Sequence, residues 1–279
     1  MPTLPYRLGL PAFAFAGWKN RYFDARPSPL ASYASVFNTV EGNTTFYRVP
    51  DRNTVAGWRD AVAGRDFQFC FKLPRGVTHG ESPDLDELKQ FLRNIEPLEP
   101  NLGPLLVQFP ARVGPADLDT MATVFEQLPA AWRSVIEVRH QAFFTRPALL
   151  DPLIQRFGAG RVVMDTRALY RGDREHPEVL AALHEKPDLP VLPELYNDLA
   201  FIRLVLHPDR RDNQRYIDDW IPRFARWLDG GTAAYMMIHC PNNLHCPELA
   251  AGFHDTLGGH VAPLASLPPW PVPLQQGLW

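Results

Sequence analysis

Short apolar runs alternate with segments of helical periodicity along almost the whole chain. The runs fall at residues 6–10, 36–41, 67–72, 104–109, 135–138, 161–165, 201–206 and 233–238. Their nearly continuous apolar character is typical of strands that are covered on both faces. Strands that alternate with helices pair in parallel, so the pattern predicts an α/β fold.

Segments with one apolar face follow these runs and predict helices. The first opens with Ser28 as N-cap and Pro29 at the first helical position, and its apolar face carries Leu30, Tyr33 and Phe37. Further helices are predicted at 54–62, 82–95, 118–128, from 145, 177–186, 217–228 and 247–257. Eight strand–helix units favour a closed (β/α)8 barrel of the TIM type. An open doubly wound sheet is the alternative fold.

The chain length agrees with one such barrel. It has 279 residues, and a (β/α)8 barrel typically needs about 250. Neither an internal repeat nor a composition change marks a domain boundary. We therefore predict a single barrel domain at 1–262, followed by a proline-rich C-terminal tail at 263–279 that lies over the surface.

Composition narrows the possible partners and compartment. The formal net charge is −3, and no run of five like charges occurs, so a broad basic face for nucleic acid is not indicated. The three cysteines, Cys70, Cys240 and Cys246, argue against a disulfide framework and fit a reducing cytosol. We find neither a signal peptide nor an apolar stretch near the ~20 residues that span a bilayer. The sequence predicts a cytoplasmic protein.

Polar residues gather where the predicted strands end. They are Glu41, Asn43, Lys72, Gln108, Glu137, Arg139, Asp165, Arg203, His207 and His239. Side chains alternate between the two faces of a strand, and most of these residues share the parity that points one way. Because barrel enzymes place their active sites at the C-terminal ends of the strands, this parity predicts a polar pocket there.

The simpler interpretation is that strand ends meet water and are polar for that reason. Arg203 argues against it, because strand-like residues follow it and should keep it inside the barrel. A buried arginine needs a carboxylate or another anion as partner. Glu41 and Glu137 are the predicted partners.

The residue types in this pocket indicate the chemistry it could support. Its cations would hold a phosphate or a carboxylate. Its carboxylates could act as acids or bases if burial shifts their pKa values, and its histidines could carry protons. We predict catalytic roles for Glu41, Glu137, Asp165 and His207, and ligand contacts for Asn43, Lys72, Gln108, Arg139, Arg203 and His239. An enzyme with these groups would be hydrolase-like or lyase-like, and a ligand sensor is the other possibility.

Metal and cofactor signals are weak. The segment 239–246 holds two histidines and two cysteines, but the spacing matches no zinc finger or ribbon, and we interpret it as a loop with incidental thiols. Asp165, Glu137 and His207 could together bind a divalent ion. No phosphate-binding loop, dinucleotide fingerprint or other cofactor motif occurs.

Several motifs resemble those of the YecE-like domain-of-unknown-function family. They include Val40-Glu41-Gly42-Asn43-Thr44-Thr45-Phe46-Tyr47, Phe69-Cys70-Phe71-Lys72-Leu73-Pro74, Glu137-Val138-Arg139-His140 and His239-Cys240-Pro241. The motifs follow one another over almost the entire chain. The resemblance implies a (β/α)8-like barrel and supplies no activity.

Two further hypotheses concern macromolecular partners. Some barrels of this shape cut damaged DNA, so nucleic-acid processing is the alternative function, by fold analogy alone. The last residues carry Gln275, Leu278 and Trp279, a spacing similar to peptides that dock on the bacterial sliding clamp. Packing of the terminal tryptophan on its own domain is the simpler interpretation.

Overall fold

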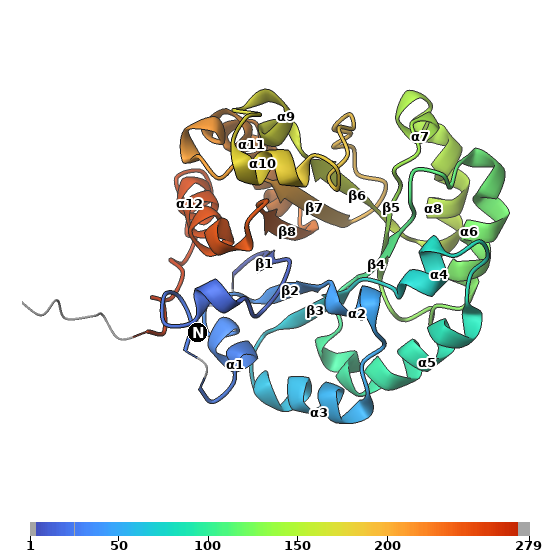
Figure 1. Ribbon diagram of the computed structural model, residues 1–279, viewed down its shortest axis with the longest axis horizontal. Coiled ribbons are helices and arrows are strands. Elements are labelled where there is room, and N and C mark those ends of the chain that lie inside the picture. The colour runs from blue at the N-terminus through green and yellow to red at the C-terminus, as the bar shows by residue number, and fades with distance from the viewer. Residues whose placement is uncertain (1–3, 25, 273–279) are drawn as a thin grey trace, which may run out of the picture.

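Eight parallel strands form the centre of the molecule, as the apolar runs predict. We describe them in a computed structural model that covers residues 4–24 and 26–272. The strands are β1 (Arg7–Leu10), β2 (Thr39–Gly42), β3 (Gln68–Phe71), β4 (Leu105–Gln108), β5 (Ser134–Glu137), β6 (Gly160–Asp165), β7 (Leu199–Val205) and β8 (Ala233–His239). They are hydrogen-bonded in the order β3-β2-β1-β8-β7-β6-β5-β4. Helices surround this ring of strands (Figure 1).

The sheet closes between its two ends, β3 and β4. The Gly103 amide donates to the carbonyl of Phe69 over 2.9 Å, and the Leu73 amide donates to the carbonyl of Leu106 over 3.1 Å. A Cβ at Gly103 would lie 2.7 Å from Sγ of Cys70, so glycine allows this close approach. The ring confirms the predicted single (β/α)8 barrel and excludes the open doubly wound sheet.

Helices of four to sixteen residues cover the barrel. They are α1 (Pro29–Tyr33), α2 (Thr44–Tyr47), α3 (Arg52–Ala61), α4 (Arg75–His79), α5 (Leu85–Ile95), α6 (Leu118–Glu126), α7 (Ala142–Thr145), α8 (Asp151–Phe157), α9 (Arg167–Arg171), α10 (Pro177–Ala182), α11 (Gln214–Asp229) and α12 (Cys246–Gly258). Short 3₁₀ turns lie at Ala16–Trp18, Glu96–Asn101, Pro115–Asp117, Pro147–Leu150, Arg210–Asp212 and Asn243–His245. Within the described ranges, no helix is both long and apolar enough to cross a bilayer.

A capping signal placed the start of the first helix correctly, whereas the predicted starts at 82 and 217 each differ by three residues from those of α5 and α11. The Ser28 hydroxyl accepts the Ala31 amide over 3.1 Å, which confirms the predicted N-cap. The apolar face of this helix was predicted to continue to Phe37, but α1 ends at Tyr33, whose carbonyl accepts the amides of Val36 and Phe37 in a turn. Helices α2, α4, α7 and α9 have only four or five residues, which is too short for a periodic pattern.

The predicted helix at 177–186 is also too long. Helix α10 ends at Ala182, and the amides of Glu185 and Lys186 turn back onto the Ala182 carbonyl. This turn changes the direction of the chain just before Lys186. The difference matters for function, because Lys186 leaves the helix and reaches the strand ends.

Alternation along the strands divides the core into an inner and an outer part. Inside the barrel, one apolar cluster contains Cys70, Leu106, Val135, Val162, Leu199, Phe201, Tyr235 and Met237. The opposite parity packs against the helices in a larger cluster. On several strands, the residue two positions beyond the inner cluster is polar. These polar side chains therefore lie above the inner core, at the C-terminal ends of the strands.

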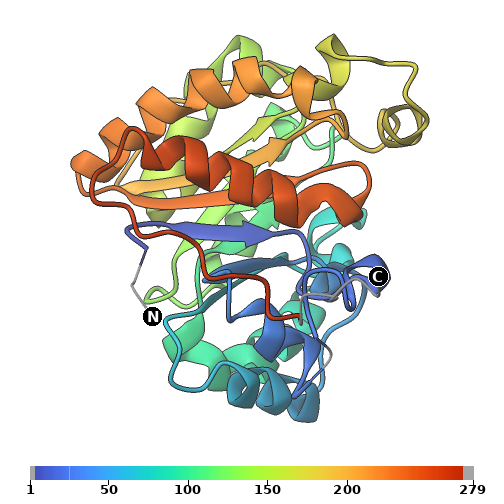
Figure 2. The ribbon, with the colours of Figure 1, turned by 90° about the vertical axis from the view of Figure 1, so that its left-hand side faces the viewer.

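The chain after α12 returns across the outside of the barrel (Figure 2). His254 on α12 contacts the Ala265 carbonyl through Nε2 over 2.9 Å. Further along, the Trp270 ring packs against Tyr22, Phe23 and Phe37 at centroid distances of 5.3–6.1 Å. The part of the tail at 263–272 is thus held on the domain. The residues of the clamp-docking hypothesis, Gln275, Leu278 and Trp279, lie outside the described residues.

A buried hydrogen bond ties helix α11 to the outside of the barrel. The Trp220 indole Nε1 donates to Oδ2 of Asp165 over 2.8 Å, and both side chains are buried. Arg167 contacts the same carboxylate over 2.9 Å. Asp165 thus faces the helix layer, so its charge serves to anchor α11 on β6.

Trp220→Phe should lower the free energy of unfolding by about 1.5–3 kcal/mol, because a buried carboxylate loses a donor while the aromatic packing is largely kept. Urea denaturation followed by circular dichroism measures this. Trp227→Phe is the matched control on the same helix, since its indole donates to no described residue. Equal losses in both variants would show that the Asp165 contact contributes nothing.

Candidate functional site

One buried arginine joins two carboxylates across the barrel interior. Arg203 of β7 is 3% exposed. Its Nε and Nη2 atoms donate to the two oxygens of Glu41 on β2, each over 2.8 Å. Its Nη1 atom donates to Oε2 of Glu137 on β5 over 2.6 Å. The predicted pairing of Arg203 with these two glutamates is confirmed.

The remaining acceptor positions of both glutamates are also used. The Asn43 amide donates to Oε1 of Glu41 over 2.8 Å, and His239 Nε2 lies 3.2 Å from Oε2. Arg139 Nε donates to Oε1 of Glu137 over 3.0 Å. Two carboxylates face two guanidinium groups, so the charges in this cluster cancel. We call Glu41, Glu137, Arg139 and Arg203 the charge cluster.

The charge cluster keeps its members ionised. Burial alone would raise the pKa of Glu41, but Arg203 and His239 outweigh it and hold the pKa well below its ordinary value. Burial likewise opposes ionisation of Glu137, and Arg203 with Arg139 lowers its pKa to about 2. Carboxylates with such low pKa values are weak bases at neutral pH. Their main role here is to compensate the arginines.

His239 is neutral and has one free nitrogen. Burial lowers its pKa to about 4, although Glu41 opposes the shift. Because Glu41 is ionised, the Nε2 atom that contacts it must carry the hydrogen. The Nδ1 atom is then an acceptor, and no described residue donates to it. This arrangement leaves a hydrogen-bond acceptor of fixed tautomer at the end of β8.

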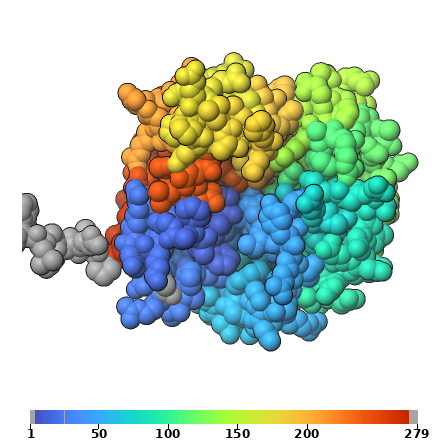
Figure 3. All heavy atoms as spheres, viewed as in Figure 1, coloured from blue at the N-terminus to red at the C-terminus, as the bar shows by residue number. Residues whose placement is uncertain are grey.

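A cavity of about 650 Å³ opens directly above the charge cluster. Arg203 and His239 form part of its floor, while Lys72, Gln108 and Arg139 line it from three other strands. Helices α2, α4 and α10 supply its rim. These helices lie on the face seen in Figures 1 and 3, where the surface is hollowed between the yellow segment of α10 and the blue residues opposite.

Two lysines in this cavity lack the ion pairs that the arginines have. Neither Lys72 nor Lys186 makes a hydrogen bond or an ion pair through its ammonium group to any residue in 4–24 or 26–272. The Lys72 ammonium lies 3.6 Å from the centroid of the Phe46 ring, a cation–π contact. Burial lowers the pKa of Lys72 to about 7, partly opposed by Glu137, and burial also lowers the pKa of Lys186.

Gln108 presents a further unused polar group. Its side chain is 1% exposed and lines the same cavity. Its Oε1 atom is buried without a hydrogen-bond partner in the described part of the chain. Buried polar atoms are almost always satisfied, so this amide is available to a ligand that donates to it.

Two of the predicted catalytic residues lie away from the cavity. Asp165 has the opposite parity from Met164 and points outward to Trp220 and Arg167. His207 follows β7 and is fixed in a loop, where Nδ1 accepts the Asp209 amide and Nε2 contacts the Asp173 carbonyl, both over 2.9 Å. Both ring nitrogens are therefore occupied. The structure corrects the predicted placement of these two side chains.

The other eight predicted residues do come together, and the structure adds one that the sequence did not reveal. Lys186 lies in an irregular stretch without periodicity, so no strand-end rule pointed to it. Its one sequence signal is rarity, because the chain has four lysines against twenty-four arginines. His79 of α4 also lines the cavity and packs edge-on against Phe46 at 4.8 Å between centroids.

The predicted alternative of a divalent ion at Asp165, Glu137 and His207 required these three side chains to meet. They lie in separate environments, and no group of three or more His, Cys, Asp or Glu side chains suited to a metal ion occurs among residues 4–24 and 26–272. The three cysteines are buried thiols.

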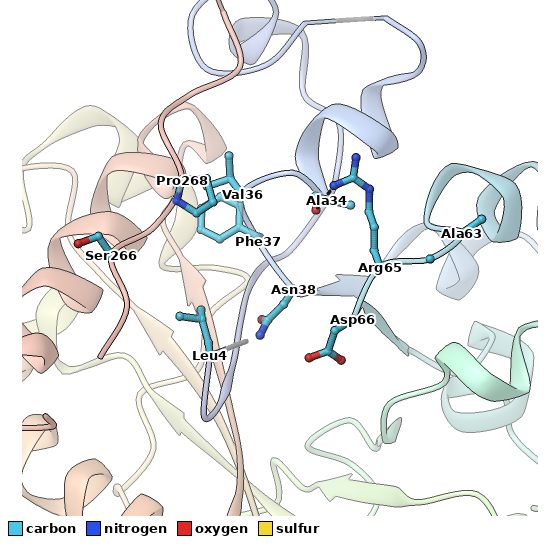
Figure 4. A pocket seen from close by; sticks show the side chains of 11 residues that line it. Leu4, Ala34, Val36, Phe37, Asn38, Ala63, Arg65, Asp66, Ser266 and Pro268 are labelled. Carbon is cyan, nitrogen blue, oxygen red and sulfur yellow. Dashed lines mark hydrogen bonds between the residues drawn. The ribbon is translucent and has the colours of Figure 1, made fainter. Parts of the chain in front are cut away.

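A second cavity, of about 550 Å³, lies at the opposite end of the barrel (Figure 4). Its amide and charged side chains are already bonded within the protein. Asn38 bridges Tyr6 and Leu8, Asp66 pairs with Arg7 over 2.6 Å, and Arg65 donates to the Ala34 carbonyl over 3.3 Å. These contacts close the N-terminal ends of the strands, so the strand-end cavity with its unpaired lysines is the better candidate site.

Comparisons with known proteins place the chain in one family. Residues 7–273 match the family described as "Protein of unknown function DUF72". The UPF0759 protein YecE of Escherichia coli strain K12 is 30% identical over 278 residues, which cover 98% of this chain and 99% of that protein. The YecE protein of strain O157:H7 matches to the same extent.

Solved structures of similar fold carry the same family description. A DUF72 family protein from Enterococcus faecalis V583 superposes with a TM-score of 0.70 at 18% identity, covering 92% of this chain and 99% of that one. One from Thermotoga maritima MSB8 gives 0.64 at 20% identity, covering 90% and 98%. None of these names supports the nucleic-acid hypothesis. The chain belongs to the DUF72 family, which includes the UPF0759 protein YecE.

Proposed function

We propose that this barrel binds a small anionic compound, one that carries a phosphate or a carboxylate, in the cavity at the C-terminal ends of its strands. The observation that carries the proposal is the pair of cavity lysines, Lys72 and Lys186, whose ammonium groups have no partner among the described residues. Buried or half-buried cations need an anion nearby. A ligand anion would supply it.

The charge cluster supports this proposal because its carboxylates cannot also neutralise the cavity lysines. Glu41 and Glu137 are fully engaged with Arg203 and Arg139, so they are not free to neutralise the lysines. Glu178 and Glu185 also line the cavity, but neither carboxylate lies within 4.0 Å of the two ammonium groups, which are therefore left for a ligand. The cavity volume of about 650 Å³ is in the range that holds small molecules.

Roles follow from the contacts that each side chain already makes. Lys72, Lys186 and the exposed part of Arg139 would hold the anionic group, and the Gln108 amide would accept or donate a hydrogen bond. His239 is the proposed hydrogen-bond acceptor for the ligand, because its Nδ1 atom is free and its tautomer is set by Glu41. Glu41, Glu137 and Arg203 are positioning groups in this scheme.

Lys186→Met should weaken sulfate binding about tenfold, because one cation that contacts the anion is lost. Isothermal titration calorimetry at pH 7 measures this. The free energy of unfolding of this variant should be equal to or higher than that of the native protein, since a desolvated charge is removed. Lys89→Met is the control, because Lys89 lies on an exposed helix face beside Asp86. Unchanged sulfate affinity in Lys186→Met would contradict the proposed site.

Sulfate affinity should fall as the pH rises through about 7. The pKa of Lys72 is lowered to about 7 in the free protein, and a bound anion favours the charged lysine. Binding above that pH must therefore take up a proton, and the dissociation constant for sulfate should rise by at most about tenfold per pH unit. Sulfate keeps its charge from pH 6 to 9, so any change of affinity over this range comes from groups of the protein. Lys72→Arg should remove the dependence, and a profile equal to the native one would refute this role.

Arg203→Met should destabilise the fold by about 3–5 kcal/mol at pH 7, because Glu41 and Glu137 would stay buried without their shared cation. Chemical denaturation measures the loss. Adding Glu41→Gln to this variant should recover part of the stability, since one uncompensated charge is removed. If Arg203→Met kept native stability and lost only sulfate affinity, Arg203 would be a ligand-binding residue and the charge cluster would not be structural.

A further inference from the structure

The use of lysine in this chain is unusual. It has four lysines, Lys19, Lys72, Lys89 and Lys186, against twenty-four arginines. Arginine thus supplies most of the positive charge, including both cations of the charge cluster. Yet two of the four lysines line the strand-end cavity. A guanidinium would bind a phosphate or carboxylate through two hydrogen bonds, so anion binding alone does not explain lysine here.

Lysine differs from arginine in that it can lose its proton inside a protein and act as a nucleophile. The surroundings of Lys72 favour this. Its stem rises from the end of β3 into the barrel, its side chain is half-buried, and no carboxylate lies within 4.0 Å of its nitrogen among the described residues. Burial disfavours the ammonium form; Arg203 and Arg139 add to this effect, and Glu137 and Glu41 oppose it. The Phe46 ring, 3.6 Å from the nitrogen, favours the charged form.

These features have a chemical consequence at neutral pH. Burial is the main cause that lowers the pKa of Lys72 to about 7, and Glu137 opposes it. About half of the molecules then carry a neutral amine at pH 7, compared with about one in 2,500 for an ordinary lysine. Desolvation beside other cations is a known way to activate a lysine toward carbonyl compounds.

We propose that Lys72 is a nucleophilic lysine that forms an imine with a small aldehyde or ketone bearing the phosphate or carboxylate of the proposed function, on which this inference rests. The Lys72 nitrogen attacks the carbonyl carbon and gives one proton to solvent, while the carbonyl oxygen takes up one proton from solvent, which yields a neutral carbinolamine. The hydroxyl group then takes up a second proton from solvent and leaves as water, so that the protonated imine remains. No oxidant or reductant takes part.

The other cavity residues fit the needs of this reaction. Lys186 and Arg139 would hold the anionic end of the substrate, which places its carbonyl carbon beside Lys72. His239 Nδ1 can accept a hydrogen bond from the substrate, and solvent water carries the protons, since a histidine with a pKa of about 4 is a weak base at pH 7. The positive imine then withdraws electrons from the adjacent carbon–carbon bond, which is the activation that a carbon–carbon lyase requires.

Reductive trapping tests the proposal on the full chain. The protein is incubated at pH 7 with glyoxylate, pyruvate or dihydroxyacetone phosphate and sodium cyanoborohydride, and the modified lysine is located by peptide mass spectrometry. At least about a tenfold excess of adduct on Lys72 over Lys19 and Lys89 is expected from the difference in neutral amine. Lys72→Arg should lose the adduct, and Lys89→Arg should retain both the adduct on Lys72 and sulfate binding.

A second measurement needs no suitable carbonyl compound. Competitive acetylation of the native protein from pH 5 to 10 gives the titration midpoint of each lysine, and Lys72 should titrate near pH 7 while Lys89 titrates near its ordinary value of about 10.4. Equal adducts on all lysines, or none on Lys72 with a midpoint near 10, overturn the imine proposal while sulfate binding stands. If the native protein does not bind sulfate, the proposed function itself is overturned.

Discussion

The site depends on one interaction, the placement of Arg203 between Glu41 and Glu137. The three side chains come from β7, β2 and β5, so their hydrogen bonds cross the barrel and connect strands that are not neighbours. A buried arginine or a buried glutamate alone would be strongly destabilising. Each is tolerated because the others are present, and the inner barrel core below them keeps water away. This mutual requirement holds the strand ends in one arrangement.

The same interaction decides which groups remain free for chemistry. Two carboxylates in a strand-end pocket would ordinarily be candidates for acid–base catalysis. Here Arg203 and Arg139 keep Glu137 at a pKa of about 2, and Arg203 with His239 keeps Glu41 ionised. Reactivity is shifted to the groups above the floor. Those groups are the two unpaired lysines, the free nitrogen of His239 and the unpartnered amide of Gln108.

The two ends of the barrel differ in how well their polar groups are hydrogen-bonded. At the N-terminal ends, the polar lining of the cavity in Figure 4 is bonded to backbone carbonyls and to Arg7. At the C-terminal ends, cations and an amide lack partners although they are half-buried or buried. Unsatisfied groups reduce stability, and a cavity that gathers several of them is typical of a binding site. This contrast favours the upper cavity independently of its size.

The sequence by itself determined the barrel and most of its strand-end residues, because both depend on local rules. Apolar runs specify strands, alternation specifies which side chains face inward, and the cost of an unpaired arginine specified the partners of Arg203. The positions of Asp165, His207 and Lys186 were decided only by the tertiary structure. Asp165 meets Trp220 of a distant helix, His207 is fixed by a loop at both nitrogens, and a turn after α10 carries Lys186 into the cavity. Such contacts depend on the path of the chain between elements, and no local period encodes that path.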